Sequence, residues 1–288
     1  MKKKSLIVRL GPLGRFGIAW ERNGEALFFP AGMWWGTDLS IKHFDHRHRL
    51  IEERDLGSGL TTNVGSLALA NDALWSATNA LNSLFAKMKY HASGTGATAA
   101  AATDIKLQTP FTSNTAPIVA GTQLLVSAAN LQKYQTVATI SYDTGTGNPT
   151  AITEWSLFSY GSTLPAVTAL SDSTGTPFTA GSATTGTVTG TVLTPSSGTA
   201  MGQQMAIIEN TGNATPHWGL VTSNTNQIVT VPAWYKVADG TAAGTFPANT
   251  NAFVHRPVMF DHRVFAAVNV SNGDSIQFTW TLTINSGG

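Results

Sequence analysis

Apolar and polar residues alternate most regularly near the end of the chain. Within residues 275–284 the apolar side chains occupy every second position, at Ile276, Phe278, Trp280, Leu282 and Ile284. Because successive side chains of a strand point to opposite faces, this alternation predicts a half-buried strand. Its apolar face requires a cover, which either another sheet or a helix must provide.

Turn signals divide the strand-rich parts of the sequence. Asn272-Gly273-Asp274 separates residues 264–270 from residues 275–284. Asn-Gly between two β-rich runs is typical of a hairpin, so we expect these two runs to pair. A turn containing Gly145, Gly147 and Pro149 likewise separates strands predicted over residues 134–142 and 151–160.

One segment has helical periodicity. Its stripe has spacings of four, three, four and three and consists of Leu74, Thr78, Leu81, Phe85 and Met88. Such a stripe lies on one face of a helix, and we predict that helix over residues 71–90, with Asn71 or Asp72 as its N-cap. The stripe lasts about two heptads, whereas a coiled coil needs three or four. We therefore expect the helix to cover the apolar face of the C-terminal strand.

The order of these patterns predicts a mainly β fold: an antiparallel β-sandwich with one packing helix, a β-rich inserted module and an extended N-terminal arm. Residues 1–60 are expected to form the arm, with hairpins around Asn23-Gly24 and around the charged turn 45–49. Residues 161–255 are rich in Thr, Gly, Ser and Ala and contain short strands, which indicates a small inserted β module. The main sandwich then comprises residues 61–160 and 256–288, so that the ends of the insertion lie close together.

The composition favours contacts between subunits over free diffusion. Of the 288 residues, 42% are hydrophobic and only 11% are charged, and there is no Cys. Charged residues make up roughly 25% of an ordinary soluble domain. The net charge of +1 is too small to imply a nucleic-acid partner. No apolar run reaches the roughly 18 residues of a transmembrane helix, so we expect no membrane partner. Lys2-Lys3-Lys4 before an apolar run mimics a signal peptide, but Arg9 interrupts that run.

The densest group of metal-capable side chains is in the charged turn, where His43, Asp45, His46 and His48 lie close in sequence. Neutral imidazoles with a carboxylate can bind zinc or nickel. A charged hairpin tip, or a subunit contact assisted by the neighbouring arginines, explains the same residues. We adopt that second interpretation and predict no metal and no cofactor.

No motif indicates catalysis. Gly94-Thr95-Gly96 resembles part of a phosphate loop, but it lacks the Gly-Lys-Ser/Thr ending and leads out of the predicted helix. Gly57-Ser58-Gly59 is too short for a nucleophile elbow. Glu154 and Asp143 are predicted on opposite sides of a turn, and Asp261-His262-Arg263 is interpreted as the entry of a strand. We therefore expect no catalytic residues and a protein that is not an enzyme.

Two groups of aromatic residues are candidates for contacts with partners. Those expected to dock the arm on neighbouring subunits are Trp20, Phe28, Phe29, Trp34 and Trp35. A second group lies in the inserted module and could stack on a sugar; it consists of Trp218, Trp234 and Tyr235. The alternative for this second group is that its rings form the core of the module.

Four blocks in order resemble a family of structural proteins of tailed-bacteriophage particles. They are Arg54–Thr62, Lys89–Ala100, Ala151–Phe158 and the region from Val264 to Trp280. The segment containing Gly219–Thr225 and Thr230–Trp234 is similar to small β modules of such proteins. The residues before position 37 match no counterpart.

The resemblance implies a non-enzymatic minor structural protein in the virion. We expect a homo-oligomer, as a ring or trimer, in the tail, neck or collar, in contact with copies of itself and with other virion proteins. The alternatives are a capsid decoration protein and a carbohydrate-binding module on a host-recognition appendage.

Overall fold

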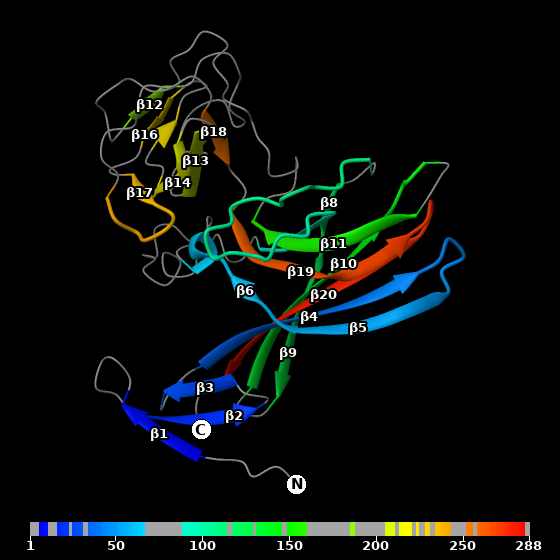
Figure 1. The fold of residues 1–288 in the computed structure, drawn as a ribbon, viewed down its shortest axis with the longest axis horizontal. Helices are drawn as coiled ribbons and strands as arrows, with labels where there is room; N and C mark the ends of the chain where they lie inside the picture. Colours follow the sequence, from blue (N-terminus) through cyan, green and yellow to red (C-terminus); the bar gives the residue numbers. More distant parts are fainter. Residues whose placement is uncertain are drawn as a thin grey trace.

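The chain folds mainly into antiparallel β-sheets, which confirms the predicted fold class (Figure 1). The computed structural model describes residues 6–10, 16–22, 25–30, 34–66, 88–113, 117–128, 131–145, 149–159, 185–187, 205–210, 213–220, 223–224, 228–230, 234–242, 252–255 and 258–285. Among these residues, a helical turn occurs at 63–66. No helix in the described part of the chain is long and apolar enough to cross a lipid bilayer.

Two five-stranded sheets form the main domain. In spatial order, sheet I contains β5 (Leu50–Ser58), β4 (Trp34–Phe44), β20 (Ser275–Asn285), β10 (Leu131–Ser141) and β9 (Thr122–Ala128). In the same manner, sheet II contains β6 (Leu60–Thr61), β19 (Met259–Val270), β11 (Thr150–Phe158), β7 (Tyr90–Gly94) and β8 (Ile118–Ala120).

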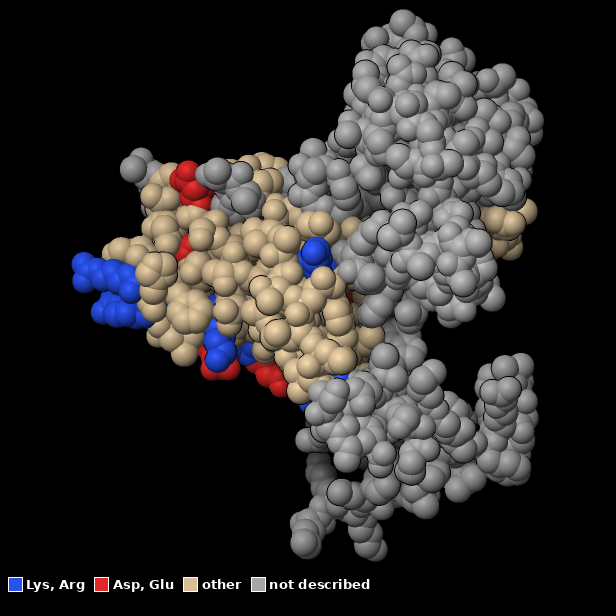
Figure 2. Space-filling model, turned by 180° about the vertical axis from the view of Figure 1, so that it is seen from behind, with Lys and Arg blue, Asp and Glu red and all other residues tan. Residues whose placement is uncertain are grey.

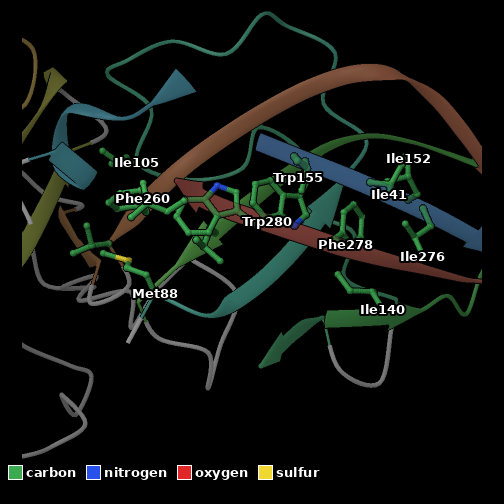
Figure 3. Packing of buried hydrophobic residues seen from close by; sticks show 14 of the residues in the cluster. Ile41, Met88, Ile105, Ile140, Ile152, Trp155, Phe260, Ile276, Phe278 and Trp280 are labelled. Carbon is green, nitrogen blue, oxygen red and sulfur yellow. The ribbon is translucent and has the colours of Figure 1, made fainter. Parts of the chain in front are cut away.

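The core lies between these two sheets (Figure 3). Phe278 of β20 stacks on Trp155 of β11 with ring centroids 6.1 Å apart, and Trp280 meets Phe260 of β19 edge-on at 5.5 Å. All four side chains are fully buried. Burying an aromatic side chain of this kind contributes about 1.5–3 kcal/mol, so these contacts hold the two sheets face to face.

The apolar face of β20 is buried as the alternation predicted, but its cover is sheet II. The helix predicted for that role, residues 71–90, lies outside the described residues except at its end. There, Met88 is buried in the same core and Tyr90 already begins β7.

The predicted C-terminal hairpin is wrong. β19 and β20 follow one another in the chain but belong to different sheets, with β19 beside β11 and β20 between β4 and β10. β10 and β11 are also consecutive and also lie in different sheets. Both connections therefore cross from one layer of the sandwich to the other.

The two crossings bind each other instead of closing hairpins. The Tyr142 N–H donates to the Asp274 carbonyl at 2.8 Å, and the Gly273 N–H donates to the Tyr142 carbonyl at 2.9 Å. Gly273 has a φ of +86°, which an L-residue rarely adopts. The backbone groups of the turn after β19 are thus hydrogen-bonded to the end of β10, where a hairpin would have paired them with each other.

The predicted N-terminal arm ends earlier than residue 60. β1 (Leu6–Leu10), β2 (Phe16–Arg22) and β3 (Glu25–Pro30) form a separate three-stranded sheet, in which the predicted hairpin around Asn23-Gly24 is present. β4 and β5 belong to sheet I, because β4 pairs with β20 along its whole length. The arm assignment is therefore wrong for residues 34–60.

The segment predicted as an insertion leaves and returns at neighbouring points of sheet II. β11 and β19 pair antiparallel, and the Ser159 N–H donates to the Val258 carbonyl at 3.1 Å. The part of the sequence between β11 and β19 forms two small sheets. The first contains β12 (Thr185–Thr187), β16 (Ile228–Thr230) and β15 (Ser223–Asn224). The second contains β17 (Tyr235–Lys236), β14 (Asn213–Leu220), β13 (Met205–Asn210) and β18 (Ala252–His255). Trp218 and Val237 join the core of the main domain, and the Asn63 side chain donates to the Val237 carbonyl at 2.9 Å.

Candidate functional site

Ionisable side chains are buried together on sheet II. Glu154 of β11 and His262 of β19 are both fully buried, with Glu154 Oε2 3.2 Å from His262 Nε2. The other ring nitrogen, His262 Nδ1, lies 2.6 Å from Oδ2 of the partly buried Asp104. We call Glu154, His262 and Asp104 the buried triad.

Glu154 organises the loop that follows β7. Its Oε1 accepts the N–H groups of Gly96 and Thr109 at 3.0 and 2.7 Å, and its Oε2 accepts that of Gln108 at 2.9 Å. A Cβ on Gly94 would lie 2.4 Å from Glu154 Oε1. The Gly-rich turn that resembled a phosphate loop is therefore built so that its backbone can surround a carboxylate of the protein itself.

The contacts of Glu154 and His262 favour the charged forms of these two side chains. Burial alone raises the pKa of Glu154, but the hydrogen bonds from His262 and from the three backbone N–H groups outweigh it and hold that pKa below 4.5. Burial alone lowers the pKa of His262, but the hydrogen bonds and charges of Glu154 and Asp104 raise it above 6.5. These shifts favour a protonated His262 beside an ionised Glu154.

This geometry does not support base catalysis by His262. A catalytic triad places a carboxylate on one imidazole nitrogen and a nucleophile on the other. Here both nitrogens face carboxylates, and the nearby hydroxyl of Ser156 donates instead to the Asp261 carbonyl at 2.7 Å. The buried triad therefore positions the loop and ties it to β11 and β19.

A second buried histidine is neutral. His91 Nδ1 accepts the Trp155 indole N–H at 3.2 Å, which leaves the proton on Nε2, 3.1 Å from the Thr136 hydroxyl. Burial lowers the pKa of His91 to about 3. Since Thr136 belongs to sheet I and His91 to sheet II, this chain of hydrogen bonds joins the layers.

Asp261 and Arg263 form a further link between the sheets. The Arg263 guanidinium makes two hydrogen bonds to the Asp261 carboxylate, at 2.9 and 3.0 Å. Asp261 also accepts the Trp280 indole N–H at 2.7 Å, and Arg263 donates to the Gly57 carbonyl. These residues were predicted only as the entry of a strand; their role becomes visible once β19 is placed opposite β20.

The structure separates the side chains of the charged turn. His43 is buried, with Nε2 3.3 Å from Asp274 Oδ2, whereas His46 and His48 are exposed. Asp45 accepts the N–H groups of Arg47 and Arg49 at 2.9 and 2.8 Å, and these hydrogen bonds lower its pKa to about 2. Within the described ranges, no cluster of three or more His, Asp or Glu side chains is arranged to hold a metal ion.

Two of the three candidate stacking residues are buried. Trp234 is 1% exposed and Trp218 is 9% exposed, and Tyr235 stacks on Trp218 with ring centroids 5.0 Å apart. The burial of Trp218 and Trp234 favours the alternative interpretation, in which their rings form part of the interior.

For the candidate arm residues, the structure describes only the strands to which they belong. Trp20 lies on β2, Phe28 and Phe29 on β3, and Trp34 and Trp35 at the start of β4. Trp35 is paired with Ile284 of β20. The side chains of these five residues lie outside what the structure describes.

The chain was also compared with known proteins. No family model, no curated protein and no solved structure matches it.

Proposed function

We propose that this chain is a non-enzymatic structural protein of a bacteriophage particle and a homo-oligomeric component of the tail, neck or collar. The observation that carries the proposal is a run of exposed apolar side chains, Leu124, Leu125 and Val126, on β9 at the edge of sheet I. A sheet edge of this kind attracts another strand unless it is covered. The protein is therefore suited to assembly with further subunits.

The chemistry of the interior supports a structural role. The ionisable groups of the buried triad, and of Asp261 and Arg263, bind one another and the backbone instead of lining an open site. The described surface seen in Figure 2 carries few charged side chains, and blue side chains gather at the end that carries the β4–β5 turn. A surface poor in charge suits permanent contacts with neighbouring subunits.

The place in the particle rests on the ordered sequence blocks that resemble virion structural proteins. Two of these blocks meet in the structure: Gly96 of the block 89–100 donates its N–H to Oε1 of Glu154, in the block 151–158, at 3.0 Å. The block from residue 264 onward contributes β20 and the core residues Phe278 and Trp280. These blocks therefore contribute residues to the core of the sandwich, which is in keeping with a structural role.

Quantitative mass spectrometry of purified particles tests the proposal. A tail, neck or collar ring requires about a dozen copies or fewer, because ring symmetry fixes the number of subunits. Hundreds of copies per particle would favour the capsid decoration protein instead. Absence of the chain from purified particles would overturn the proposal in both forms.

A further inference from the structure

The two edges of sheet I differ in charge. β5 carries Glu52, Glu53, Arg54 and Asp55, and the Arg54 side chain donates to the Ala266 carbonyl of β19 at 2.6 Å. β9 reads Thr-Gln-Leu-Leu-Val-Ser-Ala and has no charged residue. Charged side chains on an edge strand discourage pairing with another chain, so β5 is protected and β9 is not.

The exposed residues of β9 occupy both faces of the sheet. Leu125 pairs with Tyr134 of β10, which pairs with the buried Leu282 of β20, so Leu125 continues a row on the core-facing side. It is nevertheless 72% exposed, because that row ends at the edge. Leu124 and Val126 lie on the opposite face and are 46% and 43% exposed.

The sequence of β9 is symmetric about Leu125 in residue character. In an antiparallel pair of two β9 strands centred there, Leu124 of one copy lies opposite Val126 of the other, and Gln123 lies opposite Ser127. Apolar residues then meet apolar residues, polar residues meet polar residues, and no like charges face each other.

We propose that β9 pairs with β9 of a second copy across a two-fold axis at Leu125, joining the two sheets I into one continuous sheet. The two Leu125 side chains then lie directly opposite each other and extend the core-facing row from one copy into the next. A contact made by the same surface on both subunits closes at two copies. This deepens the homo-oligomer of the proposed function by naming one of its contacts.

The first test is sedimentation velocity of the full chain over a concentration series, with Leu125→Lys and Ile51→Lys as matched variants. Both replaced side chains are exposed, at 72% and 57%, and lie on opposite edges of sheet I. Leu125→Lys places two like charges face to face and should weaken association about tenfold or more. Ile51→Lys should associate like the wild type.

A second test uses the absence of cysteine from the chain. Residues opposite each other in an antiparallel pair have Cα atoms about 4.5–5.5 Å apart, within the range that a disulfide spans. Leu125→Cys should therefore oxidise to a covalent dimer. Thr122→Cys should not, because its counterpart lies about 20 Å away along the paired strands.

Several outcomes would contradict the two-fold contact. If the wild type stays monomeric at every concentration, the proposed contact does not form. Loss of association in both lysine variants indicates a head-to-tail contact between β9 and β5, and equal crosslinking of both cysteine variants indicates a different register. A monomer that is still incorporated into particles would overturn this contact alone, whereas a Leu125→Cys dimer absent from particles would overturn only the proposed function.

Discussion

His262 Nε2 lies 3.2 Å from Glu154 Oε2 where neither side chain is exposed. The pair belongs to adjacent strands, β19 and β11, and the same carboxylate holds three backbone N–H groups of the loop after β7. A buried charge that loses its partner is costly because water cannot replace that partner. The stability of this part of the sandwich should therefore depend on one carboxylate.

Replacing Glu154 with Gln is expected to lower the free energy of unfolding by about 3–5 kcal/mol. The amide keeps the shape of the side chain. Its NH₂ group, however, is itself a donor and cannot accept the backbone N–H hydrogen bonds that the carboxylate accepts. Urea denaturation followed by tryptophan fluorescence measures the change. The matched control is Glu53→Gln, since Glu53 is exposed and contacts Lys42 at 3.3 Å; its cost should be at most about 1 kcal/mol. Equal losses in the two variants would contradict the role given to Glu154.

The contribution of His262 is expected to disappear at alkaline pH. Its pKa in the folded protein is above the unfolded value of 6.5, so the stabilisation is fully present below pH 6.5 and is lost as pH rises through the folded pKa. The difference in unfolding free energy between wild type and His262→Gln should therefore shrink as pH rises above 6.5. Denaturation curves at several pH values measure it, and a difference that grows with pH would be inconsistent with a protonated His262.

His91 should make the free energy of unfolding decrease at acidic pH, whereas the contribution of His262 is lost at alkaline pH. Its folded pKa of about 3 lies below the unfolded value of 6.5, so unfolding takes up a proton between these two values. Stability should fall as pH decreases from 6.5 toward 3, by up to about 1.4 kcal/mol per pH unit from this residue. His91→Gln should flatten that slope, and parallel curves for wild type and variant would show that His91 binds a proton equally in both states.

Gly94→Ala is expected to release the loop after β7. A Cβ at this position would lie 2.3 Å from the Thr109 carbonyl oxygen and 2.4 Å from Glu154 Oε1, and overpacking of this kind costs about 1–3 kcal/mol. Hydrogen exchange should become faster at the amides of Gly96, Gln108 and Thr109. Gly145→Ala is the control, because its φ of +69° is strained for alanine but a Cβ there meets nothing within 4 Å. Unchanged exchange in the Gly94 variant would argue against the close approach.

Removal of residues 1–33 should leave a folded sandwich, because β4 and all its pairing with β20 remain. Removal of residues 1–44 should abolish folding, since β4 lies between β5 and β20 and its loss divides sheet I. Circular dichroism and thermal denaturation distinguish the two products. An unfolded 34–288 chain would show that the first three strands are part of the core domain.

The alternation of residues was sufficient to predict β20 and its buried face. The turn signals were not sufficient to predict its partner. Asn272-Gly273 reverses the chain equally well within a sheet or between sheets, and the choice is made by distant hydrogen bonds with Tyr142. Short-range patterns therefore identify strands but do not determine which strands are neighbours.

The sequence placed Glu154 beside a turn and His262 at the entry of a strand, but it did not predict the buried triad. Glu154, Asp104 and His262 are far apart in the chain, and only the pairing of β11 with β19 brings two of them together. One signal was available: an acidic residue within the apolar strand of residues 151–158, next to Trp155. Such a residue must have partners if it is buried, but the sequence does not say which ones.

The central place of β20 in sheet I has a consequence for biogenesis. β4 and β10 are synthesised long before β20, yet each pairs with it along its whole length. While the nascent chain is incomplete, both earlier strands present open edges to the ribosome exit and to chaperones. Sheet I can close only once β20 has been synthesised, so a translation product that stops before β20 keeps these strand edges open and exposed to proteolysis.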